Sequence, residues 1–316
     1  MKHKVQWIFW SGLLCLLILL YLISSTDLVL SENVNRIYNL AVIMDESTEI
    51  GYTRYRLGME EAMAEVNADV NFITLQKDGD DEEQRNLLRQ EWDNGAEAVI
   101  IFPADPAGLQ RWLQEQSRVK PVISIGAAID AGAVKQSIKA DRQMALRSLK
   151  EQLEAELAVG EQSIYILQNA AKQEASGELT KRLQEELAAR RPQLLTYAEG
   201  ELPALWERLS AKPTAIIATD RSSLEMAMAL QKERQTEHRL YGFGMSDTII
   251  AGLQRRECLG ISGSHQYQMG YQAILSAVQA IRGEKVQQKE LAFDDRWVRP
   301  QQIYEDETEN MIFPIN

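Results

Sequence analysis

One stretch of the sequence, residues 96–106 (AEAVIIFPADP), limits the possible folds of this chain more than any other. Its apolar run from Val99 to Phe102 is too short for an ordinary helix and ends at a proline, so we predict a strand buried on both faces, as in a parallel sheet. Asp105 and Pro106 then supply an N-cap and a first-turn proline for a helix. The turn before them therefore lies at the carboxyl end of a parallel strand, where open α/β sheets bind ligands.

Strands and helices alternate along the rest of the chain from Ile37 onward. Short apolar runs typical of strands, among them KPVISIG, SIYILQN and TAIIATD, recur between segments whose apolar residues repeat at helical spacing. Such alternation predicts parallel sheets with right-handed crossovers. A single sheet of ten or more strands is uncommon. We therefore expect an α/β protein of two doubly wound units side by side, with strand ends from both units lining a cleft between them.

Composition and motifs exclude several classes of function. A formal net charge of -12 argues against nucleic acid as a partner, because phosphate contacts need a basic face. Cys15 and Cys258 are the only cysteines, and their positions match neither a disulfide framework nor a metal cluster. No G-x-S-x-G elbow, phosphate loop or H-E-x-x-H helix follows a strand, so we expect no enzyme, no cofactor and no metal. The acidic pairs in residues 80–83 and 294–295 are interpreted as solvated or capping charges.

The N-terminal segment has the features of a membrane anchor or a signal peptide. A basic Lys-His-Lys stretch at residues 2–4 precedes an almost uninterrupted apolar run from Val5 to Ile23. The run is long enough for a membrane span with its positive end inside, and it exceeds the usual core of a signal peptide. A cleaved signal peptide is the alternative. Both interpretations place the globular part outside the cytoplasm, either on a single-pass anchor or secreted to the periplasm or beyond.

Several motifs together resemble one known family. PADP, KPVISIG, TAIIATD followed by SSLEMAMAL, YGFG and HQYQMGYQAILSAVQAIRGE are similar, in this order, to segments of the periplasmic sugar-binding proteins of the ribose-binding type. The similarity runs from about Ile37 to about Glu305. The type I periplasmic binding protein fold of that family is shared with the ligand domains of lactose-repressor-type regulators. The resemblance implies two lobes, joined by three crossings, that close on a small ligand.

The resemblance also implies domain boundaries. Crossings between the lobes are expected near Gly126, near His265 and at residues 284–290. The expected parts of the chain are a stub with the anchor or signal segment and its tether (1–36), an N-terminal lobe (37–126 plus 266–283), a C-terminal lobe (127–265 plus 284–308) and a tail (309–316).

The expected ligand contacts follow from the same resemblance. They are polar or aromatic residues at strand ends and crossings: Glu46, Tyr52, Asp105, Asp141, Arg142, Thr219, Asp220, Ser264 and Gln266. Tyr52 would stack on a sugar ring, or alternatively pack on its own lobe. Asp105 would accept from ligand hydroxyls or serve only as the helix cap. Arg142 would favour a carboxylate or phosphate on the ligand, or else pair only with Asp141.

The pair Thr219-Asp220 stands where the family has Asn-Asp. Ser222 and Glu225 have the spacing of a capping box, which would leave the carboxylate of Asp220 free for the cleft. We therefore expect Asp220 to contact the ligand.

Other positions depart from the family pattern. Gly126 and Gly244 replace aspartates, Ser264 replaces a glutamine, and Leu179 falls where an arginine is common. An unpaired buried polar group costs about 1–3 kcal/mol, so these losses would weaken the binding of a family-typical sugar. We expect a different small polar ligand or a modified pocket, with residues 265–266 (His-Gln) as local substitutes.

Two roles without catalysis fit these features. One is solute capture for an ABC-type import permease, and the other is sensing, in which an anchored binder reports its ligand to a membrane receptor such as a histidine kinase. Both depend on a ligand that stabilises the closed state. An interaction or scaffold ectodomain that no longer binds a ligand is the alternative.

Overall fold

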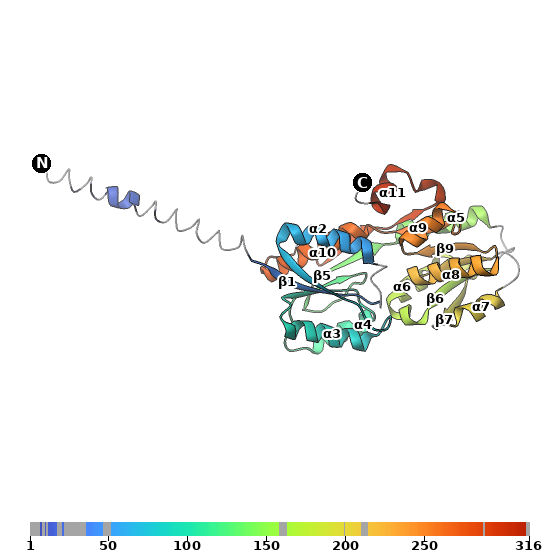
Figure 1. Cartoon of the computed structure of the whole chain (residues 1–316), viewed down its shortest axis with the longest axis horizontal. Helices are drawn as coiled ribbons and strands as arrows, with labels where there is room; N and C mark the ends of the chain where they lie inside the picture. The colour runs from blue at the N-terminus through green and yellow to red at the C-terminus, as the bar shows by residue number, and fades with distance from the viewer. Residues whose placement is uncertain are drawn as a thin grey trace. The chain divides into compact units, whose positions relative to one another are not determined.

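The structure is a computed structural model of the chain (Figure 1). It describes residues 7, 10, 12–17, 21, 36–46, 52–157, 163–198, 200–209, 214–286 and 288–313. The contacts between residues divide the chain into two compact units, Met1–Tyr38 and Asn39–Asn316. Most of the segment expected to be an anchor or signal peptide, and nearly all of its tether, lie outside the described residues. In the part that is described, no helix has the length and apolar character needed to cross a membrane.

The first sheet has six strands in the order β11-β5-β4-β3-β1-β2. The pairs β1–β3, β3–β4, β4–β5 and β5–β11 are all parallel. The strands are β1 (Tyr38–Ile43), β2 (Ala68–Ile73), β3 (Ala98–Ile101), β4 (Val122–Ile125), β5 (Val134–Asp141) and β11 (Glu290–Asp294). Helices α2 (Thr53–Val66) and α10 (Gln266–Ile281) cover one face, while α3 (Asp81–Asn94) and α4 (Pro106–Glu115) cover the other (Figure 1). We call this sheet with its helices the first lobe.

The second sheet also has six strands, in the order β12-β10-β9-β8-β6-β7. Only β12 runs antiparallel to its neighbour, β10, among the pairs that the described residues define. The strands are β6 (Ile164–Asn169), β7 (Gln193–Tyr197), β8 (Ala215–Ala218), β9 (Arg239–Phe243), β10 (Gly260–Gly263) and β12 (Arg296–Val298). With its helices it forms the second lobe. The expectation of two sheets dominated by parallel pairs is confirmed.

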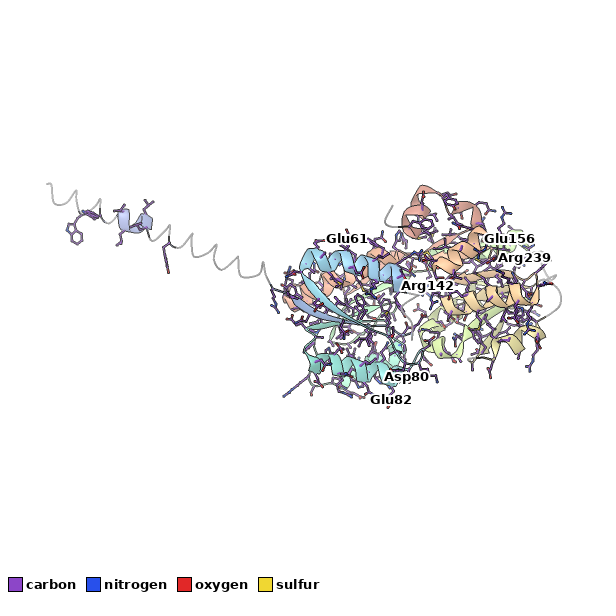
Figure 2. All side chains as sticks on the ribbon, viewed as in Figure 1. Glu61, Asp80, Glu82, Arg142, Glu156 and Arg239 are labelled. Carbon is purple, nitrogen blue, oxygen red and sulfur yellow. The ribbon has the colours of Figure 1, made fainter. Side chains whose placement is uncertain are left out.

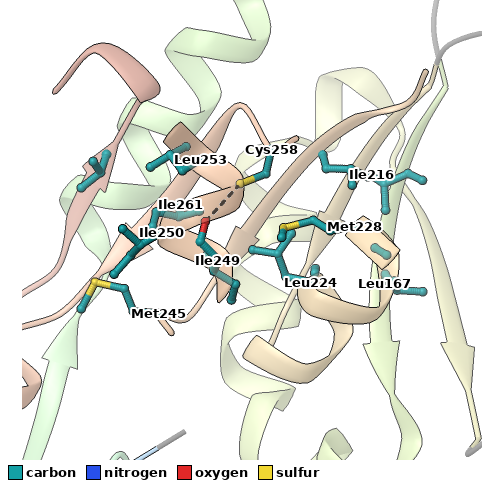
Figure 3. Close-up of a cluster of buried hydrophobic side chains, with 14 of the residues drawn as sticks. Leu167, Ile216, Leu224, Met228, Met245, Ile249, Ile250, Leu253, Cys258 and Ile261 are labelled. Carbon is teal, nitrogen blue, oxygen red and sulfur yellow. Dashed lines mark hydrogen bonds between the residues drawn. The ribbon is translucent and has the colours of Figure 1, made fainter. Parts of the chain in front are cut away.

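Helices cover both faces of the second sheet. Their bounds are α5 (Gln143–Glu156), α6 (Gln173–Glu186), α7 (Leu202–Arg208), α8 (Arg221–Arg234), α9 (Asp247–Gln254) and α11 (Asp306–Ile312). Three short 3-10 helices, η3 (Ala170–Lys172), η4 (Ala188–Arg190) and η5 (Pro300–Gln302), lie between them. Figure 3 shows the core that α8 and α9 form with the sheet. Cys258 is fully buried there, with Sγ 4.0 Å from the carbonyl oxygen of Ile249, and burial raises the pKa of this thiol to about 12.

The chain passes between the two sheets at three points: after Asp141 at the end of β5, at Ser264–His265 between β10 and α10, and at Asp295 between β11 and β12. This differs from the expected crossings near Gly126 and at residues 284–290, because β5 and β11 pair within the first sheet. The loop from β4 to the parallel strand β5 contains no helix. Strand–helix alternation therefore breaks at Gly126 without any change of sheet.

Two glycines allow α2 and α10 to pack at backbone contact. A Cβ added at Gly58 would lie 2.0 Å from the carbonyl oxygen of Tyr267, and one at Gly270 would lie 2.1 Å from that of Tyr55. No side chain fits in either place without moving a helix. This contact matters for the cleft because Tyr52 immediately precedes α2 and Gln266 is the first residue of α10.

Candidate ligand-binding cleft

The carboxyl ends of strands from both sheets meet around a cleft between the lobes. Its inner part is a cavity of about 210 Å³ lined by residues that follow β1, β6, β8 and β10. An outer hollow of about 540 Å³ lies beside it, near Asp105 and the start of α5. Arg142, Ala175 and Leu179 line both spaces, so the inner cavity and the outer hollow adjoin along a shared wall. Figure 2 labels Arg142 at the junction of the lobes.

Buried ion pairs join the two lobes across the inner cavity. From the second lobe, Lys172 Nζ lies 2.8 Å from Asp45 Oδ2 and 3.3 Å from Glu46 Oε1 in the first lobe. Arg221 also pairs with Glu46, and it holds Glu225 of its own helix at 2.6 Å. The side chain of Lys172 is only 5% exposed. We call Asp45, Glu46, Lys172 and Arg221 the interlobe charge cluster.

Burial and charge act on the pKa values in this cluster. Burial raises the pKa of Glu46, and the neighbouring carboxylate of Asp45 adds to this, while Lys172 and Arg221 oppose it. Burial lowers the pKa of Lys172, but the carboxylates of Asp45 and Glu46 outweigh burial, so that this pKa lies above its ordinary value. Lys172 is therefore a cation throughout the physiological range.

The sequence identified only Glu46 of this cluster. Asp45, Lys172 and Arg221 were missed, although each lies within a few residues of the carboxyl end of a strand. A charged residue in the turn after a strand was the feature of the sequence that could have identified them as cleft residues. The sequence did not show that charges separated by as many as 175 residues, as Glu46 and Arg221 are, meet across the cleft.

Of the expected contacts in the first lobe, Tyr52 lies in the cavity wall and Asp105 lies at the outer hollow. The hydroxyl of Tyr52 donates to Asp45, and its ring packs edge-on against Phe102 with centroids 4.7 Å apart. Asp105 accepts from the backbone N–H of Gly108 at 2.8 Å and so caps α4. Tyr52 therefore packs on its own lobe and Asp105 serves as a helix cap, as the alternatives for these two residues stated.

Asp220 lines the inner cavity, but its carboxylate is not free. It caps α8 itself, because its Oδ1 accepts from the backbone N–H of Ser223 at 2.9 Å. The hydroxyls of Ser222 and Ser223 also donate to its carboxylate, each at 2.6 Å. The expectation of a free carboxylate was wrong, because Glu225 binds Arg221 and Ser246 instead of closing a capping box. Thr219 donates to the carbonyl of Leu167 at 3.2 Å.

The remaining expected contacts lie at the first two crossings. Asp141 accepts from the backbone N–H of Gln143 at 3.0 Å and lines the outer hollow, while Arg142 lines both parts of the cleft. Ser264 is hydrogen-bonded to Tyr55 in the wall of the inner cavity. Gln266 is 8% exposed and also lines this cavity.

Asp295, at the third crossing, is a functional candidate that the sequence analysis misread as a solvated charge. It is 2% exposed and lines the inner cavity. Its Oδ2 accepts from the hydroxyl of Ser262 at 2.5 Å and lies 3.6 Å from Arg142 Nε. Its Oδ1 is buried and has no hydrogen-bond partner among the described residues. Burial raises the pKa of Asp295 to about 6 against the opposing effect of Arg142.

A raised carboxyl pKa gives a stability change with a definite sign. Between the ordinary carboxyl pKa of 3.8 and the raised pKa of about 6, the folded state binds the proton more tightly than the unfolded chain, so the contribution of Asp295 to stability falls as the pH rises through this window. The loss is at most about 3 kcal/mol. We expect Asp295→Asn to raise the free energy of unfolding more at pH 7.5 than at pH 5, measured by urea denaturation. An equal effect at both pH values would show that Asp295 has an ordinary pKa.

Comparison with known proteins identifies the family. The family model described as periplasmic binding protein domain matches residues 40–285. This chain belongs to that family. The expected resemblance to periplasmic sugar-binding proteins of the ribose-binding type is thereby confirmed. No curated protein sequence matches the chain.

Solved structures similar to this family member show the same fold. A carbohydrate transporter solute-binding protein from Agrobacterium radiobacter, in complex with D-arabinose, has a TM-score of 0.71 at 17% identity, over 88% of this chain and 99% of that one. A LacI-type transcriptional regulator from Bacteroides fragilis has a TM-score of 0.69 at 16% identity, over 85% of this chain and 99% of that one. The complex of the TorS sensor domain with TorT in the absence of ligand has a TM-score of 0.68 at 15% identity, over 88% of this chain and 98% of that one. Identities this low establish the fold alone.

Proposed function

We propose that this protein is an extracytoplasmic solute-binding protein that closes on a sugar or another small polar solute and presents the closed form to a membrane partner. The observation that carries this proposal is the inner cavity, which is lined by both lobes and by residues at all three crossings. A solute held there contacts both lobes only when they are closed, so its binding favours closure. The protein acts by binding, without catalysis.

Sensing is the preferred role of the closed form, ahead of delivery to an import permease. The apolar run from Val5 to Ile23 fits a retained single-pass anchor, which keeps a binder beside one membrane partner. The similarity to a complex with the TorS sensor domain adds support for a sensor protein as that partner. Release of a mature protein that begins near Thr26 would contradict the anchored form and favour transport.

Thermal-shift screening of the full-length protein in nanodiscs tests ligand binding. A solute that binds only the folded form stabilises it by about 2.7 kcal/mol at a hundredfold excess over its Kd. We expect at least one member of a panel of sugars, polyols, nucleosides and small acids to raise the melting temperature, with calorimetry confirming one site. No response to any member of the panel would contradict solute binding and support the scaffold alternative.

A further inference from the structure

Most polar groups around the inner cavity are already paired within the protein. The interlobe charge cluster neutralises itself across the cleft, and Tyr52 adds a hydrogen bond to Asp45. Asp220 is occupied by the helix cap and two hydroxyls, and Thr219 by a backbone carbonyl. These groups would have to give up existing partners before they could bind a solute.

Three side chains in the cavity wall have binding capacity left, and each comes from a different crossing. Among the described residues, the guanidinium of Arg142 has one contact, 3.6 Å from Asp295 Oδ2, and the side-chain amide of Gln266 has no hydrogen-bond partner. The third is the buried Oδ1 of Asp295. A guanidinium, an amide and a buried carboxylate therefore line the same small space.

We propose that Arg142, Gln266 and Asp295 bind a small dipolar molecule that carries both a carboxylate and an ammonium group, as an amino acid does. This inference rests on the proposed function and names the ligand class of the same cleft. The carboxylate lies against Arg142 and Gln266, and the ammonium donates to the carboxylate of Asp295. Gln266 begins α10, a helix of 16 residues, whose N-terminal dipole also favours a carboxylate.

The charges around the cavity select against other ligand classes. Four acids (Asp45, Glu46, Asp220 and Asp295) and three bases (Arg142, Lys172 and Arg221) line it. An anion adds to this excess of negative charge, and a simple cation meets Arg142 without a group to offset it. A neutral polyol can hydrogen-bond to both end groups, but it brings no charge of its own to pair with Arg142 or Asp295, whereas an ammonium or a carboxylate forms an ion pair with a hydrogen bond. A dipolar molecule makes such bonds at both ends and leaves the net charge unchanged.

The size and apolar lining of the cavity fit the same class. A volume of about 210 Å³ equals that of roughly seven waters in the liquid, which suits an amino acid with a modest side chain. The rings of Tyr55, Phe102 and Phe243 line the cavity and offer an apolar surface for that side chain.

Matched ligands test the proposal on the full-length protein in nanodiscs. Thermal shift against the L- and D-forms of the proteinogenic amino acids, D-arabinose and myo-inositol identifies the best binder. Calorimetry then compares that binder with its hydroxy acid, which lacks the ammonium, and its amine, which lacks the carboxylate; for serine these are glycerate and ethanolamine. We expect an amino acid to bind, and each analogue to bind about tenfold to a hundredfold more weakly.

Variants test whether the assigned residues make these contacts. Arg142→Gln and Asp295→Asn should each weaken binding of the amino acid by about tenfold to a hundredfold. Matched substitutions of exposed residues, Arg234→Gln on α8 and Asp93→Asn on α3, should leave binding unchanged. Circular dichroism and melting temperature confirm that each variant folds. Lys172 and the rest of the interlobe charge cluster remain intact in all four proteins.

The outcomes separate this inference from the proposed function. If a sugar or polyol binds and no amino acid does, the dipolar ligand is ruled out while solute binding stands. If an amino acid binds equally well to Arg142→Gln and Asp295→Asn, the assigned site is wrong. If no compound of either class binds, both the inference and the proposed function fall.

Discussion

Replacing Lys172 with methionine is expected to lower the free energy of unfolding by about 3–5 kcal/mol, because it leaves buried carboxylates without their counterion. The ammonium group holds Asp45 at 2.8 Å and Glu46 at 3.3 Å, with the lysine side chain 5% exposed. Methionine preserves the apolar length of the side chain, so lost packing contributes little. Urea denaturation of the variant and the wild type in the same buffer measures the difference.

A surface pair supplies the control for Lys172. Lys150 lies 3.6 Å from Glu186, and both side chains are about two-fifths exposed. We expect Lys150→Met to change the free energy of unfolding by no more than about 1 kcal/mol, the range of exposed ion pairs. If Lys172→Met and Lys150→Met lowered the free energy of unfolding by the same small amount, the ion pairs between the lobes would stabilise the protein no more than exposed ion pairs do.

Gly58→Ala is expected to destabilise the protein by about 1–3 kcal/mol or more, the usual cost of overpacking. The new Cβ would lie 2.0 Å from the carbonyl oxygen of Tyr267 and 3.0 Å from the backbone nitrogen of Tyr271, so α2 and α10 would have to separate. The neighbouring ends of these helices hold Tyr52 and Gln266. Ligand affinity should therefore fall together with stability.

The same substitution at Gly177 should have the opposite sign. Gly177 lies inside α6, and an added Cβ would meet nothing within 4 Å. Alanine favours the helix over glycine by about 0.5–1 kcal/mol, so Gly177→Ala should raise the melting temperature. If Gly58→Ala raised the melting temperature as Gly177→Ala does, the two helices would not pack at backbone contact.

The sequence was a good guide to local structure and to the family. Val99 to Ile101 is a strand buried on every residue, and Asp105 caps the following helix, because both features depend on neighbours in the chain. The sheet of strand β5 was misassigned since it follows β4 without a helix between them. The alternation of elements carries no information about such a connection.

The site was harder to predict than the fold because its chemistry depends on long-range pairing. Nothing near Lys172 in the sequence indicates that it meets Asp45, which is 127 residues away. Asp295 resembles an ordinary acidic turn, and only the packing of the crossings buries it. A free carboxylate was predicted at Asp220, but this carboxylate accepts a hydrogen bond from the backbone of Ser223. The carboxylate oxygen without a partner among the described residues is instead Oδ1 of Asp295.

The distance between the lobes is the most direct test of closure on a solute. Fluorophores on Arg111→Cys in α4 and Lys181→Cys in α6, in a Cys15→Ser background, report this distance by single-molecule energy transfer, since the buried thiol of Cys258 does not label. With Lys172→Met added to remove ion pairs between the lobes, a saturating solute should shift the population to the shorter distance. An unchanged distance distribution with a solute that calorimetry shows to be bound would contradict closure.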